Sequence, residues 1–195
     1  MFTIAWDVDD VLNDLTKQWL CYYCEGKNIE IEYKDILLNP PHNILNITFD
    51  EYINSLDSFR LSTKALDLLP NDKVLNWFEQ YGYLFNHIVI TSTAARTSQN
   101  SAFWIMKHFY KWIHSFNIVP SYRVDDNVVR NDKTKKDYLE RVGNVDIFID
   151  DNECNIKDAK ELGIKNFLVY QTWNSNVLKI ESILTELTKI GKNNK

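Results

Sequence analysis

Three aspartates, Asp7, Asp9 and Asp10, follow directly on an apolar run over residues 2–6 that has the composition of a buried strand. Like charges a few ångströms apart raise each other's pKa values, so such a group is unfavourable unless a cation lies beside it. Carboxylate oxygens are the ligands that Mg²⁺ prefers. In open α/β sheets the carboxyl ends of the strands also border the usual ligand crevice. The motif therefore predicts metal-assisted chemistry at the end of the first strand.

Further polar groups follow later apolar runs, so four groups stand at the ends of predicted strands. In chain order they are Asp7 and Asp9, then Thr91 and Ser92, then a lysine among Lys133, Lys135 and Lys136, and finally Asp150 and Asp151. Because the carboxyl ends of parallel strands meet at one edge of a sheet, we expect these groups to lie close together. Phosphoryl transfer needs such a set, since it depends on positioning and on neutralising charge on the phosphate oxygens.

The ordered set resembles the haloacid dehalogenase (HAD) superfamily of phosphohydrolases, over the whole chain except the stretch between the first two motifs. The resemblance implies that Asp7 is the nucleophile and forms an aspartyl phosphate, and that Asp9 is the general acid and base. It implies that Thr91 is the hydroxyl residue of the second motif. It also implies a Mg²⁺ site formed by Asp7, the backbone carbonyl of Asp9, and Asp150, with Asp151 orienting a metal-bound water or the lysine.

Two positions match the family pattern incompletely. Lys135, at the start of a predicted helix, has the commonest arrangement for the phosphate-binding lysine and is preferred. Lys133, followed by Thr134, resembles instead the deoxyribonucleotidase branch of the family and remains the alternative. The residue after Asp9 is usually Gly in this family, and here it is Asp10, which makes the first loop more acidic.

The spacing of apolar residues predicts the elements that position these groups. Strands and helices alternate after residue 70, which is typical of a mostly parallel sheet with helices on both faces. We predict an α/β core with a Rossmann-like, three-layer parallel sheet. It comprises residues 1–15 and 69–191 and is followed by a tail of residues 192–195. Its predicted strands are 2–6, 84–91, 116–120, 145–149 and 166–170, and its predicted helices are 70–81, 95–112, 135–142, 155–162 and 177–190.

Residues 16–68 differ from the rest of the chain, because their apolar residues recur at helical spacing and little in them resembles a buried strand. Thr48 and Glu51 have the spacing of a capping box at the start of one such helix. We therefore predict a small α-helical cap inserted after the first strand and placed over the strand ends. In the family that the motifs resemble, an insertion at this position closes over the phosphate site and selects the substrate.

The cap suggests a nucleoside monophosphate, because its aromatic side chains would stack on a nucleobase. Aromatic residues at helical spacing are usually core, so only Phe59 and Arg60, at a predicted helix end, are favoured as substrate contacts. Ser92 is a candidate for the phosphate pocket, although capping of a loop start explains it equally well. Arg96 is a further candidate, although an arginine there is more commonly exposed. A narrower resemblance to the pyrimidine 5′(3′)-deoxyribonucleotidases lies in residues 7–12, 69–70 and 91–92.

Composition limits the remaining classes of protein. A chain of 195 residues with 45% apolar content suits one domain with a sizeable core. The formal net charge of −5 disfavours a nucleic acid polymer as partner. The chain holds no apolar run near the roughly 20 residues that a membrane span needs, and its three cysteines are too few for a disulfide framework. We therefore expect a cytoplasmic protein without a membrane partner, acting as a monomer or a homodimer on a small phosphorylated metabolite.

The leading hypothesis is a Mg²⁺-dependent phosphoric monoester hydrolase. A phosphotransferase or phosphomutase would form the same aspartyl phosphate and differs in the acceptor that cap closure admits. A receiver-type signalling domain also combines aspartates, a hydroxyl and a lysine, but it carries its acidic pair first, whereas this chain carries it last. A non-catalytic relative that only binds phosphate and Mg²⁺ would not need Asp9.

Overall fold

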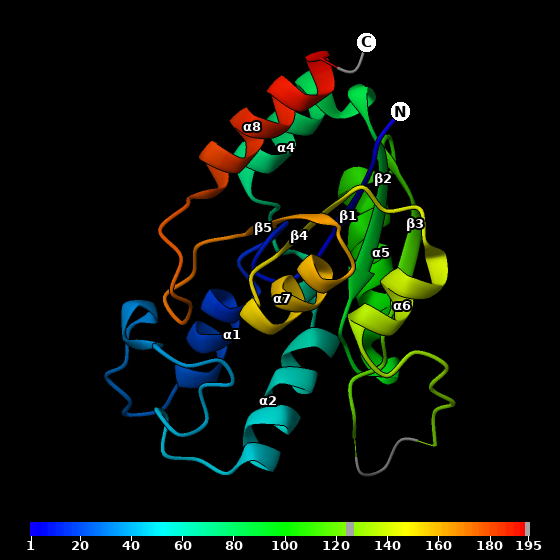
Figure 1. Ribbon diagram of the computed structural model, residues 1–195. Coiled ribbons are helices and arrows are strands. Elements are labelled where there is room, and N and C mark those ends of the chain that lie inside the picture. The colour runs from blue at the N-terminus through cyan, green and yellow to red at the C-terminus, as the bar shows by residue number, and fades with distance from the viewer. Residues whose placement is uncertain (124–126, 194–195) are drawn as a thin grey trace.

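The computed structural model describes residues 1–123 and 127–193, and at its centre lies a five-stranded sheet flanked by helices (Figure 1). The strands lie in the order β3–β2–β1–β4–β5, and every neighbouring pair is parallel. The strands are β1 (Thr3–Trp6), β2 (Asn86–Thr91), β3 (Ile113–Ile118), β4 (Ile147–Asp150) and β5 (Lys165–Leu168). The predicted α/β fold with a parallel, Rossmann-like sheet is confirmed.

Eight α-helices and three short 3-10 helices connect and cover the strands in the described part of the chain. The α-helices are α1 (Leu15–Cys24), α2 (Phe49–Leu61), α3 (Thr63–Leu66), α4 (Asp72–Tyr81), α5 (Ser98–Phe109), α6 (Lys135–Val142), α7 (Glu153–Glu161) and α8 (Ile180–Asn193). The 3-10 helices are η1 (Tyr33–Asp35), η2 (Gly82–Leu84) and η3 (Ala95–Thr97). Of these helices, none is long and apolar enough to cross a membrane.

Alternate residues of the strands face two different layers, as the geometry of a strand requires. Ile4 and Trp6 of β1 belong to the larger core, which α4, α5 and α8 complete, whereas Ala5 belongs to a smaller core beneath α6 and α7. The sheet thus separates two helical layers, as predicted. In the larger core Trp6 Nε1 donates a hydrogen bond to His87 Nδ1 (3.0 Å), which ties β1 to β2.

Helix α6 begins and ends at the residues that the sequence predicts. The Thr134 hydroxyl accepts a hydrogen bond from the backbone N–H of Asp137 (3.1 Å), and the Asp137 carboxylate accepts one from the N–H of Thr134 (3.0 Å). Gly143 ends the helix in the left-handed conformation, with φ 67°. These local contacts fix Lys135 as the first residue of α6, close to the end of β4.

Residues 16–68 contain helices α2 and α3, most of α1, the short η1 and no strand. The Thr48 hydroxyl caps α2 by accepting a hydrogen bond from the N–H of Glu51 (3.1 Å). Helices α1 and α2 lie at the end of the molecule away from the N-terminus, near the carboxyl ends of the strands (Figure 1). Trp19 and Phe59 are buried in the same core as Trp6, so the segment and the sheet share their apolar contacts.

The C-terminal helix has the predicted length but lies three residues later in the chain, because it begins at Ile180 and not at residue 177. Gly191 was expected to end it, but α8 continues to Asn193, so residues 192 and 193 are helical rather than part of a tail. Residues 194 and 195 of the predicted tail lie outside the described residues. A Cβ at position 191 would lie 2.8 Å from the ring of Phe85. Gly191 therefore allows close packing of the helix and does not terminate it.

Strand β3 also begins earlier than predicted, at Ile113 instead of residue 116. His114 and Ser115 interrupt the apolar pattern before Phe116, so the first residues of the strand were missed; the strand ends at Ile118 and not at residue 120. The strand lies at the edge of the sheet, where polar side chains reach solvent without penalty.

Candidate active site

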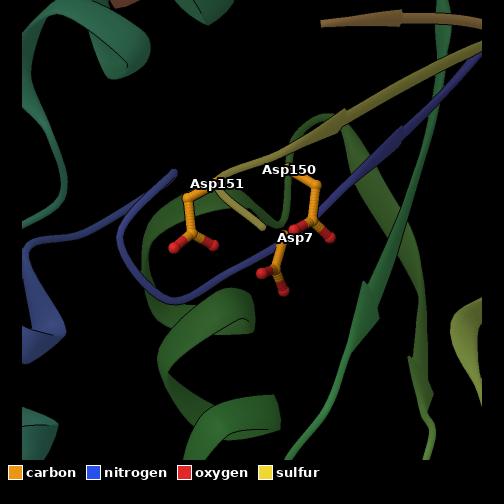
Figure 2. A group of neighbouring side chains, drawn as sticks. All are labelled: Asp7, Asp150 and Asp151. Atoms are coloured by element: carbon orange, nitrogen blue, oxygen red, sulfur yellow. The ribbon is translucent and has the colours of Figure 1, made fainter. Parts of the chain in front are cut away.

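Three buried carboxylates meet at the carboxyl edge of the sheet. Asp7 follows β1, Asp150 ends β4, and Asp151 follows it; they are 7%, 0% and 6% exposed. One carboxylate oxygen of each lies within 4.8 Å of the others. Figure 2 shows the three side chains projecting to the same side of the strand ends. Together with Lys135 we call them the acidic cluster.

Lys135 holds two of these carboxylates. Its Nζ lies 2.7 Å from Asp7 Oδ1 and 2.7 Å from Asp150 Oδ2, and its side chain is buried. Burial lowers the pKa of Lys135, but Asp150 and Asp7 outweigh this effect and raise the pKa above its ordinary value. Lys135 is therefore a fixed positive charge at the centre of the cluster.

The acidic cluster carries more negative charge than Lys135 neutralises, since three carboxylates face one ammonium group. Burial is the largest effect on Asp7, and with the charges of Asp150 and Asp9 it raises the pKa of Asp7 to about 7 despite the opposing effect of Lys135. Burial, followed by the charges of Asp150 and Asp7, raises the pKa of Asp151 well above its ordinary value. A cation bound beside these carboxylates would stabilise their charged forms.

The donor set of the cluster fits a hard divalent cation. Three carboxylate oxygens that approach one another closely, in a site of net negative charge, are ligands that Mg²⁺ and not a soft metal prefers. Asp7, Asp150 and Asp151 can therefore hold such an ion. The Asp9 carboxylate lies outside this group and has another partner. The predicted metal contact of Asp9 is through its backbone carbonyl and stays a prediction.

Asp9 is held by the cap. Arg60, on α2, donates a hydrogen bond from Nη2 to Asp9 Oδ2 (2.6 Å), and both side chains are largely buried. The backbone of Asp9 follows β1, whereas Arg60 belongs to residues 16–68, so this ion pair joins the two parts of the chain. Arg60, predicted to contact substrate, is placed in the structure against the candidate acid and base.

Asp10 occupies a backbone conformation that favours glycine. Its φ is 61°, in the left-handed region that glycine adopts readily and that Asp and Asn tolerate better than other residues. Its carboxylate accepts hydrogen bonds from the Thr16 hydroxyl (2.5 Å) and the Thr16 N–H (2.9 Å). Burial raises the pKa of Asp10 to about 7, although the bonds from Thr16 lower it.

A cavity of about 350 Å³ adjoins the acidic cluster, within the usual range for small-ligand sites. Thr91 and Ser92 line it at the end of β2, as the sequence predicts; Thr91 is buried and Ser92 is exposed. The cap contributes Phe49 and Tyr52. The remaining lining residues are Asp7, Asp9, Asp10, Leu15, Thr16, Asn39, Ile53, Leu56, Arg60, Ser121, Tyr122, Arg123, Lys135, Asp151, Asn152 and Asn155.

Two predicted site residues do not reach this cavity. Phe59 is 1% exposed and packs on Tyr22, with the ring centroids 5.3 Å apart. It is a core residue, contrary to the prediction, because a helix-end aromatic fits core and substrate roles equally well in sequence. Lys133, the alternative phosphate-binding lysine, is exposed, and its backbone N–H bonds to Asp137.

A second group of charged residues borders the cavity and was not predicted as a unit; Asp57, Arg60 and Arg123 in it are buried, and Arg96 is partly exposed. Asp57 of α2 accepts two hydrogen bonds from Arg123 (2.8 Å each) and two from Arg96 (3.1 and 2.8 Å). Arg60 Nη1 lies 4.0 Å from Asp57. Burial raises the pKa of Asp57, but its bonds to Arg123 and Arg96 lower it overall. We call Asp57 and these three arginines the arginine cluster.

Comparison with known proteins identifies the fold. No protein-family model matches the sequence, and no curated protein matches it. Similar solved structures include a haloacid dehalogenase-like hydrolase from Streptococcus pneumoniae, with a TM-score of 0.62 and 14% identity over 95% of this chain and 90% of that one. The HAD-hydrolase YfnB of Bacillus subtilis, solved with bound magnesium, has a TM-score of 0.62 and 16% identity over 97% of both chains. A HAD-superfamily hydrolase from Geobacter sulfurreducens has a TM-score of 0.56 and 11% identity over 96% of both chains. The chain has the haloacid dehalogenase-like fold.

Proposed function

We propose that the protein is a Mg²⁺-dependent phosphohydrolase that cleaves a small phosphomonoester through an aspartyl phosphate on Asp7. The observation that carries this proposal is the contact of Lys135 Nζ with both Asp7 and Asp150, at 2.7 Å each. It fixes a candidate nucleophile beside a cation and two further carboxylates at the edge of a cavity. The shared fold supports the reaction class, and the magnesium bound to the YfnB structure supports the choice of cation.

The reaction would proceed in two displacements. A carboxylate oxygen of Asp7 attacks phosphorus, the ester P–O bond breaks, and the leaving oxygen takes its electron pair and a proton from Asp9. Water then attacks phosphorus, Asp9 accepts a proton from that water, and the bond to Asp7 breaks to release inorganic phosphate. Arg60 acts as a positioning residue, because its hydrogen bond fixes the direction of the Asp9 carboxylate.

Charge on the phosphate must be neutralised from several sides. Bound by Asp7, Asp150 and Asp151, Mg²⁺ would supply positive charge next to the phosphate oxygens. Lys135 uses two of its three N–H groups on Asp7 and Asp150, which leaves one for a phosphate oxygen. The Thr91 hydroxyl lines the same cavity and would bind another.

Residues 16–68 would act as the cap that selects the substrate. Their aromatic residues Phe49 and Tyr52 line the catalytic cavity, which supports a nucleoside monophosphate as the favoured class of substrate. A small metabolite suits the cavity volume of about 350 Å³ better than a polymer does.

Phosphate release tests the proposal directly. Wild type is assayed on nucleoside monophosphates, sugar phosphates and p-nitrophenyl phosphate, with Mg²⁺ and with EDTA. We expect metal-dependent turnover that falls by at least about 10⁴-fold in Asp7→Asn, which lacks the nucleophile, and by roughly 10²- to 10⁴-fold in Asp9→Asn. Asp14→Asn is the matched control, because Asp14 is exposed and does not line the cavity.

Two outcomes would contradict the proposal. Appreciable turnover by Asp7→Asn would exclude an aspartyl phosphate at this residue. A wild type that becomes phosphorylated on Asp7, yet releases phosphate only to an added alcohol acceptor, would establish a phosphotransferase instead.

A further inference from the structure

The arginine cluster has more positive charge than its own carboxylate neutralises. Three guanidinium groups surround Asp57, which is 2% exposed. Arg60 has a second partner in Asp9, so Arg96 and Arg123 have Asp57 as their shared carboxylate. Among the residues that the structure describes, two guanidinium groups on one carboxylate leave a formal excess of one positive charge.

This excess lies beside a second cavity. Arg96 and Arg123 line a space of about 380 Å³ together with Phe49, Asp50, Ile53, Asn54 and Tyr122. Asp50 is exposed and, within the described residues, forms no ion pair with either arginine. Four of these residues, Phe49, Ile53, Tyr122 and Arg123, also line the catalytic cavity, so the two spaces adjoin. A ligand whose phosphate lies at the acidic cluster can therefore extend toward Arg96 and Arg123.

Donor groups remain available for such a ligand. Arg96 bonds to Asp57 through Nε and Nη2, and within residues 1–123 and 127–193 its Nη1 makes no hydrogen bond. The side chain of Arg96 is 37% exposed, so its position is accessible from the cavity. Arg123 is nearly buried and bonds to Asp57, Ser121 and Tyr122, which holds its charge in place. The pair thus combines a fixed charge with a guanidinium that still has donors.

We propose that Arg96 and Arg123 bind a second anionic group of the substrate, a carboxylate or a second phosphate, in the cavity that adjoins the catalytic one. This inference rests on the proposed phosphohydrolase function and narrows the substrate to a phosphomonoester that carries another negative charge. Guanidinium groups bind both kinds of anion through paired N–H donors. Arg96 would make the direct contact, and Arg123 would contribute its charge.

The competing role is structural, because the same contacts attach α2 to the core. Asp57 lies in the cap, whereas Arg96 and Arg123 follow β2 and β3. If attachment were their only role, removing Arg96 would change stability without changing the choice of ligand. A ratio between two ligands separates the two roles, since a loss of folded protein cancels in it.

Matched pairs of compounds provide that ratio. Adenosine 3′,5′-bisphosphate is compared with adenosine 5′-monophosphate, and 3-phosphoglycerate with glycerol 3-phosphate, so that one arm tests a second phosphate and the other a carboxylate. The two measurements are kcat/KM for wild type and the dissociation constant for Asp7→Asn in calorimetry. Each is repeated with Arg96→Gln, with Arg96→Lys and with Lys107→Gln, an exposed cation on α5 that serves as the control.

In at least one arm we expect a preference of about tenfold or more for the compound with the second anion. The preference should fall to within about threefold in Arg96→Gln, be partly retained in Arg96→Lys and be unchanged in Lys107→Gln. Equal ratios in wild type and Arg96→Gln in both arms would overturn the inference. The ratio of dissociation constants from calorimetry needs no turnover. It therefore decides the inference even if no phosphate is released and the proposed function is wrong.

Discussion

The acidic cluster and the arginine cluster border the same cavity, but they differ in sign and in how the fold assembles them. In the acidic cluster three carboxylates share Lys135, whereas in the arginine cluster three guanidinium groups approach Asp57. The first is built at the ends of two adjacent strands of one sheet. The second joins a helix of the cap to two segments of the core. The first therefore has more negative than positive charge, whereas the second has more positive than negative charge around Asp57 and also fastens the cap.

The largest loss of stability should follow from removing the positive charge of Lys135 from the acidic cluster. Lys135→Met leaves Asp7 and Asp150 buried without their cation, so we expect a loss of about 3 kcal/mol in the free energy of unfolding in EDTA at pH 8. Added Mg²⁺ should restore part of it, because the ion replaces the missing charge. Urea unfolding monitored by circular dichroism measures both effects.

The adjacent lysine is the control for this prediction. Lys136 pairs with Glu161 at 2.6 Å, but both side chains are substantially exposed. Lys136→Met should therefore cost at most about 1 kcal/mol. If Lys135→Met and Lys136→Met lost the same free energy of unfolding, the buried carboxylates of the acidic cluster would not depend on Lys135 for their stability.

A smaller loss of stability is expected when the carboxylate of the arginine cluster is removed. Asp57→Asn removes the carboxylate that binds Arg96 and Arg123, and we expect a loss of about 2 kcal/mol, reduced because water in the cavity reaches the arginines. Inorganic sulfate should stabilise this variant more than wild type, since the guanidinium groups have lost their anion. Thermal unfolding across a sulfate series provides the measurement.

Asp67→Asn provides the comparison on the exposed surface. Asp67 also forms an ion pair with α5, through Lys107 at 3.5 Å, but the Asp67 side chain is 77% exposed. Its loss should change stability by less than about 1 kcal/mol and should not alter the sulfate response. An Asp57→Asn variant that responded to sulfate no more than Asp67→Asn does would show that the cluster carries no excess positive charge.

The two clusters also differ in how far the sequence predicts them. Asp7 and Asp150 each stand at the end of an apolar run, and parallel strands bring such ends together, so a local pattern was sufficient. Lys135 was placed by an equally local signal, the cap at Thr134 and the stop at Gly143. The sheet, its helical layers and the helical character of residues 16–68 follow from the same kind of periodicity.

The arginine cluster has no local signal of this kind. Asp57 and Arg123 are 66 residues apart, and neither differs in sequence context from an exposed charged residue. The prediction that Phe59 contacts substrate was wrong for a related reason. Helical spacing identifies a buried face of a helix but does not show which residues cover that face. Gly191 was read as a helix stop, although tertiary packing against Phe85 decides its role. What the sequence leaves open is thus the set of contacts between distant segments.

The smallest predicted effect uses pH to test the environment next to the acidic cluster. The pKa of Asp10 is about 7 in the folded protein, compared with 3.8 ordinarily, so the folded chain binds a proton that the unfolded chain has already lost. Wild type should therefore lose about 1.4 kcal/mol of stability through this group between pH 6 and pH 8. Asp10→Asn has no such group, and its side chain can still bond to Thr16.

The difference in unfolding free energy between Asp10→Asn and wild type should accordingly shift by about 1.4 kcal/mol in favour of the variant over this pH range. Taking the difference cancels every other titrating group that the two proteins share. Urea midpoints at pH 6 and pH 8, both in EDTA, measure it, and Asp67→Asn, which alters an exposed carboxylate that is not among the charges acting on Asp10, provides the control. A constant difference would mean that Asp10 is ionised throughout the range and that burial does not raise its pKa to about 7.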